Sequence, residues 1–540
     1  MTQATITVDD ALRAHPPARP KLDVGFDART ALVFFAVLAG GLFFIAYSLY
    51  VDMTQSGVRS TSWMPFVLLG VALFVALGFE FVNGFHDTAN AVATVIYTHS
   101  LPAHIAVVWS GLFNFLGVMV SSGAVAYGII ALLPVELILQ VGSSAGFAMV
   151  FALLIGAIIW NLGTWYLGLP ASSSHTLIGS IIGVGLANQL MAVASGASGV
   201  DWAQASKVGY SLLLSPLIGF GASALLLLTL KLVARSPVLY QEPKTTAPPP
   251  AWIRGLLVLT CTGVSFAHGS NDGQKGMGLI MLILIGVAPT AYALNRSMPD
   301  TEVRPFVTTA SYAAQTLDRY ANGRTVTDPR AVAGAYLRTR QPDPNVVPAL
   351  AALSRGIVTQ VQEYGSFRRL PQDTVQNVRN DMYLTSEAIK RFSKDTATVK
   401  LTKADLDLLN AYRKELDGAT RFIPTWVKVA VAIALGLGTM VGWKRIVITV
   451  GEKIGKSHLT YAQGASAELV AAATIAAADM YGLPVSTTHV LSSGVAGTMA
   501  AGRSGLQMST VRNLLMAWVL TLPAAILLSG SLFWLFTKIF

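Results

Sequence analysis

The sequence is short of charged residues and of cysteine. Only 12% of its 540 residues are charged, half of the roughly 25% that soluble domains carry. Its one cysteine, Cys261, excludes a disulfide within the chain and a metal site built from cysteines. Between Thr88 and Val200 the only Asp, Glu, Lys or Arg is Glu136. With 53% hydrophobic residues, the chain is predicted to cross a membrane several times rather than to form a soluble domain.

The formal net charge of +10 does not indicate a nucleic-acid partner. The basic residues cluster beside apolar segments, as at Lys444 and Arg445 or Arg503 and Arg512. This is the pattern of the positive-inside rule, in which cytoplasmic loops carry the Lys and Arg residues. The clusters place the N-terminus in the cytoplasm. We therefore expect a multi-pass protein that is embedded in the lipid bilayer of the inner membrane.

Eleven apolar segments predict an all-α polytopic membrane protein with eleven crossings. A polar loop interrupts the apolar pattern once, and a proline-rich stretch separates two halves. The expected parts are a disordered cytoplasmic tail (1–30), an extra transmembrane helix (31–50), a first repeat (65–235), a linker (236–250), the start of a second repeat (251–290), a polar inserted domain (291–426) and the rest of the second repeat (427–540).

Two motif pairs indicate an internal repeat. NGFHDTAN at 83–90 recurs as HGSNDGQK at 268–275, and GLPASSSH at 168–175 recurs as GLPVSTTH at 482–489. The offsets are 185 and 314 residues, and they differ by about the length of the polar insert. The charge pattern gives the halves opposite orientation. We therefore predict inverted five-helix repeats with interrupted helices behind one extra N-terminal helix, an architecture whose binding site lies near the midplane.

Two carboxylates occupy the first motif pair, Asp87 and Asp272. A carboxylate inside an apolar segment is costly and marks an ion or proton pathway by default. Capping of a helix or a buried ion pair is the alternative role. Adjacent glycines such as Gly84 and Gly269 permit the helix to unwind, which would expose backbone carbonyls to a cation.

Hydroxyl residues follow a proline in the second motif pair. Proline beside Ser or Thr is typical of a helix start. The hydroxyls and free N–H groups of such a first turn suit an oxyanion, although plain capping or close helix packing explains each triplet alone. The predicted anion-binding residues are Ser172, Ser173, Ser174, Ser486, Thr487 and Thr488.

His175 and His489 occupy equivalent positions at the end of the second motif pair. Histidine titrates near physiological pH, so each could relay a proton, or each could be an ordinary buried histidine with a hydrogen bond. His86 and His268 allow the same two interpretations. Glu80, one turn before the first motif, is a further candidate for proton transfer.

These motifs resemble those of the inorganic phosphate transporter (PiT) family. The resemblance rests on FVNGFHDTANAVATVIYT at 81–98, AHGSNDGQKG at 267–276, GLPASSSHTLIG at 168–179 and GLPVSTTHVLSS at 482–493. The chain is particularly similar to the bacterial low-affinity, proton-coupled members. That resemblance implies symport of inorganic phosphate with protons, the phosphate travelling as a neutral complex with a divalent metal such as magnesium. It would place the metal, with its substrate, near Asp87 and Asp272.

One position departs from the sodium-coupled members of that family. They carry an Asn three residues after the Asp of both halves; here Asn90 is present, but Lys275 stands at the second position. An ammonium group there could take the place of a cation and neutralise Asp272, which favours proton coupling. The residues expected to couple cation or proton movement are Asp87, Asn90, Asp272, Asn271, Lys275, Glu80, His175 and His489.

Several alternatives stay open at this stage. Sulfate is close to phosphate in shape and would suit the same ligands, and sodium coupling through the first half is a second alternative. A membrane hydrolase using His and Ser is disfavoured, because the candidate residues lie at buried, repeated positions and no HExxH motif is present. We therefore expect that the protein is not an enzyme and that it binds no cofactor other than the transported metal. A homodimer is an open expectation.

Overall fold

The computed structural model describes residues 19–22, 28–56, 63–87, 89–139, 143–191, 199–243, 245–339, 341–393 and 400–539. Throughout these segments the chain is helical, and the only β feature is an isolated bridge between Gly455 and Leu506. The predicted all-α fold is therefore confirmed. The predicted tail at 1–30 lies almost wholly outside the described residues.

The helices up to the proline-rich stretch are α2 (Ala28–Gln55), α3 (Met64–Asp87), α4 (Ala89–Tyr97), α5 (Ala103–Val120), α6 (Ala124–Ile130), α7 (Val135–Leu139), α8 (Ser144–Tyr166), α9 (Ser173–Met191), α10 (Trp202–Val233) and the 3-10 turn η2 (Pro237–Tyr240). After it come α11 (Ala251–Val287) and α12 (Pro289–Tyr292), then α13 (Asp300–Ala321), α14 (Pro329–Thr339), α15 (Val346–Tyr364), η3 (Phe367–Arg369), α16 (Gln372–Phe392) and α17 (Lys403–Thr420). The last are α18 (Thr425–Thr439), α19 (Lys444–Ile448), the π-helical turn η4 (Thr449–Lys453), α20 (Tyr461–Met480), α21 (Thr487–Gly502) and α22 (Met508–Phe536).

Among the described residues, seven helical segments are long and apolar enough to cross a membrane, or eight if the bent pair α17–α18 counts as one span. They are α2, α3 with α4, α5, α8, α10, α11 and α22. This is fewer than the eleven crossings that the apolar pattern predicts. The remaining apolar segments are too short or too polar to count as membrane spans by themselves. Among them are α9 and α21, which begin at the polar triplets.

The predicted helix interruption is wrong in the second half, and in the first half it falls at Thr88, which lies outside the described residues, so there it stays a prediction. In the first half α3 ends at Asp87 and α4 begins at Ala89. In the second half α11 runs unbroken through Gly269 and Gly273. A Cβ atom at Gly269 would lie 2.1 Å from the Asn114 carbonyl oxygen of α5. The glycines of α11 therefore allow a close helix crossing instead of unwinding the helix.

Close crossings of this kind pack helices of the first half directly against helices of the second half. Gly84 of α3 meets α18, where its Cβ would lie 2.3 Å from the Leu435 carbonyl oxygen, just as Gly269 of α11 meets α5. Gly183 of α9 approaches the Ile526 carbonyl of α22, and Gly497 of α21 approaches that of Phe220 in α10, with a Cβ distance of 2.2 Å in each case. The paired glycines keep the 185- and 314-residue offsets of the motifs. The inverted repeat is a sequence prediction, and this reciprocal packing supports it.

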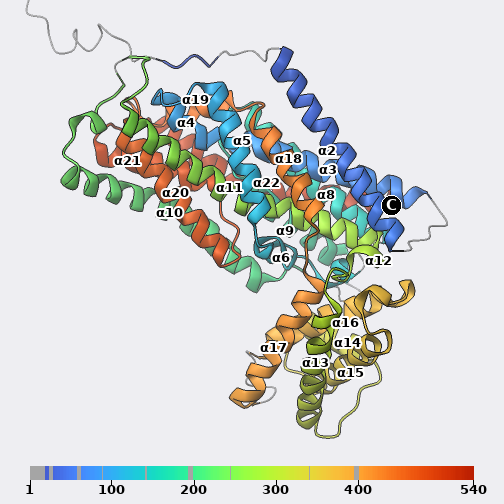
Figure 1. The fold of residues 1–540 in the computed structure, drawn as a ribbon. Helices are drawn as coiled ribbons and strands as arrows, with labels where there is room; N and C mark the ends of the chain where they lie inside the picture. The colour runs from blue at the N-terminus through green and yellow to red at the C-terminus, as the bar shows by residue number, and fades with distance from the viewer. Residues whose placement is uncertain are drawn as a thin grey trace, which may run out of the picture.

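The polar loop between α12 and α18 folds into a helical bundle of α13 to α17, which we call the insert. In Figure 1 the insert projects from one end of the membrane-spanning helices, while α2 lies along their outside. The last turns of α2 reach the same end, because Asp52 accepts hydrogen bonds from Tyr292 (2.8 Å) and Trp426 (2.9 Å). The end of α2 and the insert therefore lie on the same side of the membrane.

The close crossing at Gly269 generates a stability prediction. Gly269→Ala adds a Cβ that backbone atoms of α5 cannot accommodate, so we expect a loss of about 1–3 kcal/mol and a lower melting temperature in detergent. Gly255→Ala, in the same helix with no atom within 4 Å of the added Cβ, should leave melting unchanged or slightly raised. Equal melting of the two variants would contradict the close crossing.

Candidate functional site

The four repeated motifs meet around Asp87, which is buried at the end of α3. Ser173 of the first triplet donates a hydrogen bond to its carboxylate at 2.5 Å, and Thr488 of the second triplet donates another at 2.7 Å. His86 lies 3.1 Å away through its Nδ1 atom. One carboxylate thus joins hydroxyl groups that stand more than 300 residues apart in the sequence.

Asp272 lies next to this group on α11. Its carboxylate forms an ion pair with Lys275 at 2.6 Å and lies 3.4 Å from both His268 and Ser173. Lys275 also donates to Ser173 at 3.3 Å. All four side chains are buried. Since Lys275 reaches both the carboxylate and the hydroxyl, its ammonium group lies where a bound cation would contact the same atoms.

The two asparagines of the motifs hold the backbone around the site. Asn90 donates to the Asp87 carbonyl at 2.9 Å and to Thr488 at 3.1 Å. Asn271 donates to the Leu483 carbonyl at 3.1 Å and accepts from the Val485 N–H at 3.5 Å. Asn90 therefore positions an anion-site hydroxyl, and Asn271 positions the loop that precedes it.

Both hydroxyl triplets form helix starts, as the sequence predicts. Ser172 accepts a hydrogen bond from the His175 N–H at 3.2 Å, and Ser486 accepts one from the His489 N–H at 3.1 Å. Ser174 donates to the Val485 carbonyl at 2.6 Å, which ties one loop to the other. Thr487 keeps a buried hydroxyl with no hydrogen-bond partner among the described residues. Two helix N-termini, each favourable to an anion, thus converge on one point.

His175 and His489 lie against one another on the helices that carry the triplets. Their rings lie 4.5 Å apart, and Trp518 stacks on His489 at 4.1 Å. Both line a largely apolar cavity of about 600 Å³ between α10, α21 and α22. Their role as proton relays stays a prediction.

Glu80 is buried one turn before the first motif and accepts a hydrogen bond from Asn83 at 3.4 Å. It packs against α11, where a Cβ at Gly276 would lie 2.3 Å from its Cγ atom. The carboxylate therefore lies beside the helix that carries Asp272 and Lys275.

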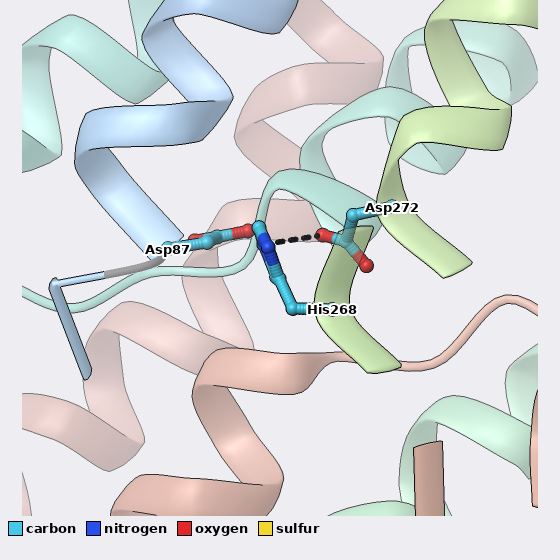
Figure 2. Close-up of side chains that lie close together, drawn as sticks. All are labelled: Asp87, His268 and Asp272. Carbon is cyan, nitrogen blue, oxygen red and sulfur yellow. Dashed lines mark ion pairs between the residues drawn. The ribbon is translucent and has the colours of Figure 1, made fainter. Parts of the chain in front are cut away.

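Asp87, Asp272 and His268 could together hold a metal ion. One ligand atom from each lies within 4.8 Å of the others, and Figure 2 shows His268 lying between the two carboxylates. Carboxylate oxygens suit magnesium and calcium, and an added imidazole suits transition metals such as manganese, iron or zinc. The sequence suggested His268 as a proton relay or an ordinary buried histidine, and not as a metal ligand. Its spacing of four residues from Asp272, one face of a helix, was the signal for a ligand role.

A further buried carboxylate, Glu468 of α20, was not predicted from the motifs. It accepts hydrogen bonds from Thr260 at 2.5 Å and from Thr94 of α4. It lies outside all four motifs, so the repeat gave no reason to single it out. The available signal was a lone glutamate in an apolar segment, which by itself indicates a functional position.

A model of the phosphate transporter family matches residues 83–529, a range that includes every motif of the site. The chain is also 45% identical over 488 residues to the low-affinity inorganic phosphate transporter PitA of Escherichia coli K12, covering 87% of this chain and 96% of the relative. The chain belongs to the phosphate transporter family. This family member is therefore a multi-pass membrane protein and a transporter, not an enzyme.

Further relatives extend the comparison. PitB of E. coli K12 is 42% identical over 484 residues, with the same coverage of 87% and 96%. A probable low-affinity inorganic phosphate transporter of Bacillus subtilis is 28% identical over 475 residues, covering 88% of this chain and 98% of the relative. A solved structure titled "The sodium-dependent phosphate transporter" is similar at a TM-score of 0.48 and 20% identity, covering 88% of this chain and all of that one.

The buried pair of Asp272 and Lys275 predicts a double-mutant result. Lys275→Met leaves a buried carboxylate without its cation, which should cost about 3–5 kcal/mol and lower the melting temperature in detergent. Adding Asp272→Asn removes the stranded charge, so the double variant should recover most of the lost stability. A double variant that melts as low as Lys275→Met alone would show that the pair does not interact as the structure places it.

Proposed function

We propose that the chain carries inorganic phosphate into the cell together with protons, the phosphate travelling as a neutral complex with a divalent metal. The family and its low-affinity relatives support inorganic phosphate as the cargo. The net charge of the site is the observation that supports the second part of this proposal, that phosphate travels as a neutral complex with a metal. Counting ionised carboxylates and the lysine, Asp87, Asp272 and Lys275 leave a net negative charge in a buried region.

A net negative site would repel a bare phosphate dianion. The Coulomb energy of like charges a few ångströms apart is large where water is excluded. A divalent metal that enters with the phosphate removes this repulsion, since the metal faces the carboxylates and the phosphate faces the two helix N-termini. Asp87, His268 and Asp272 would contact the metal, and Ser172 to Ser174 with Ser486 to Thr488 would contact the phosphate.

Proton coupling is supported by the lysine in the second half. Lys275 contacts Asp272 at 2.6 Å and Ser173 at 3.3 Å, so this half already contains a fixed cation. A proton can still reach Asp87 or Glu80. Sodium coupling is the second candidate, because Asp87 and Asn90 of the first half remain in contact with Thr488 and offer oxygen ligands.

The proposed orientation of the protein in the membrane follows from the contacts that join the end of α2 to the base of the insert. With the N-terminus in the cytoplasm, as the basic clusters predict, α2 crosses once and ends outside. Its contacts through Asp52 support an outside position for the insert as well. In a bacterial inner membrane, phosphate would therefore first meet the side that carries the insert.

Uptake into proteoliposomes tests the proposal. Labelled phosphate should accumulate when the outside is more acidic, and magnesium should stimulate it. Asp87→Asn and Asp272→Asn should each lower uptake by about 10–100-fold, since they remove contacts to the bound cation. Asp407→Asn, an exposed carboxylate of the insert, is the matched control. Wild-type protein that takes up no phosphate under any gradient would refute the proposal.

The choice of ions is tested in the same vesicles. Excess sulfate should compete only weakly with phosphate uptake, because sulfate carries no proton near neutral pH and cannot donate a hydrogen bond to a buried carboxylate such as Asp87, whereas hydrogen phosphate can. Uptake should not depend on sodium, because Lys275 holds the second cation position. A requirement for sodium would overturn the role given to Lys275, and strong competition by sulfate would overturn the selectivity for phosphate.

A further inference from the structure

A second polar cavity lies where the insert joins the membrane-spanning helices, apart from the site described above. Its volume is about 600 Å³. It is lined by the last residues of α2, the turn after α12, the η3 turn of the insert and the chain that leads into α18. None of its lining residues belongs to the four repeated motifs. Figure 1 shows α12 at the junction between the membrane-spanning helices and the insert.

Two arginines from different parts of the chain meet in this cavity. Arg296 follows α12, and Arg368 belongs to η3; both line the cavity. The Nε atom of Arg368 donates a hydrogen bond to the Arg296 carbonyl at 2.5 Å. This bond holds the Arg368 side chain against the backbone of Arg296, so that both residues line the same cavity.

Neither guanidinium group has an ion-pair partner within the part of the chain that the structure describes. The Nε atom of Arg296 is buried and has no hydrogen-bond acceptor there. Burial also lowers the pKa of Arg296, because it removes water from the charged group. A buried donor without an acceptor is costly, and so is a charged group that has lost part of its water. An anion in the cavity would relieve both costs.

The only carboxylate among the lining residues does not supply that anion. Asp52 uses its Oδ2 atom to accept hydrogen bonds from Tyr292 at 2.8 Å and from Trp426 at 2.9 Å. These bonds attach the end of α2 to α12 and α18. The acidic residue therefore serves the docking of α2, and the two arginines still face the cavity.

We propose that Arg296 and Arg368 bind a phosphate group at this junction. Guanidinium groups form paired hydrogen bonds with phosphate oxygens, and two of them match its tetrahedral arrangement better than they match a planar carboxylate. The group could come from inorganic phosphate on the side of the insert or from an anionic phospholipid, because the cavity lies at the end of the outer helix α2 beside Trp426. Bound there, it joins the insert to the membrane-spanning helices.

The test measures binding of inorganic phosphate or of an anionic phospholipid to the full-length protein, and it does not depend on transport. The variants are Arg296→Gln and Arg368→Gln, which remove charge at similar size. Arg369→Gln is the matched control, because Arg369 is the exposed neighbour in the same turn and does not line the cavity. Melting temperatures check that each variant is folded, and Arg368→Lys retains the charge without the paired donors.

Two arms separate the sources of the phosphate group. In nanodiscs of phosphatidylcholine, inorganic phosphate is titrated and its binding measured by calorimetry. In membranes that contain phosphatidylglycerol, the lipid that stays bound is counted by native mass spectrometry. We expect the two Gln variants to weaken binding roughly tenfold or more in one arm, with Arg368→Lys intermediate and Arg369→Gln like the wild type. A loss in the first arm identifies inorganic phosphate, and a loss in the second identifies the lipid.

Binding by Arg296→Gln and Arg368→Gln that matches Arg369→Gln in both arms would overturn the proposal. The result is independent of the transport mechanism, since these variants leave the central site intact. A failure of phosphate uptake in vesicles would not change the outcome of either arm.

Discussion

The structure depends on how one small buried region balances its charges. Asp87 and Asp272 face a single lysine, Lys275, at a point where no water-exposed surface screens them. Hydroxyl groups and helix N-termini complete the surroundings and favour an anion, whereas the carboxylates favour a cation. Under the proposed function, a site with both preferences would bind phosphate and a divalent metal together rather than either one alone.

Close contact between the two halves makes this arrangement possible. Each half contributes one carboxylate motif and one hydroxyl triplet, so the site exists only where the halves interlock. Glycines at the helix crossings, such as Gly84 against α18 and Gly269 against α5, bring the backbones near enough for Ser173 and Thr488 to reach the same carboxylate. Relative movement of the halves would therefore change the site itself, and binding of cargo would be coupled to the movement that releases it.

The sequence predicted the helical membrane fold and brought the right motifs to attention, because charges inside apolar segments and a repeated spacing leave clear signals. Prediction from the sequence was wrong where one residue type can serve two structural roles. Glycines beside Asp272 suggested an unwound helix, yet in α11 they serve helix packing. The repeat also gave no reason to single out Glu468, whose threonine partners come from α4 and α11 and become neighbours only in the folded chain. The approach of His268 to Asp87 likewise depends on a distance that no spacing along the chain contains.

The charge that moves with each phosphate tests the central claim most directly. Currents can be recorded from vesicles on a solid support when phosphate is added with magnesium, at equal pH on both sides. A neutral metal–hydrogen phosphate complex with a proton carries net positive charge inward, so the account predicts an inward positive current that disappears when the metal is removed. An inward negative current, or a current of unchanged size without divalent metal, would show that phosphate crosses as a free anion and would contradict the account.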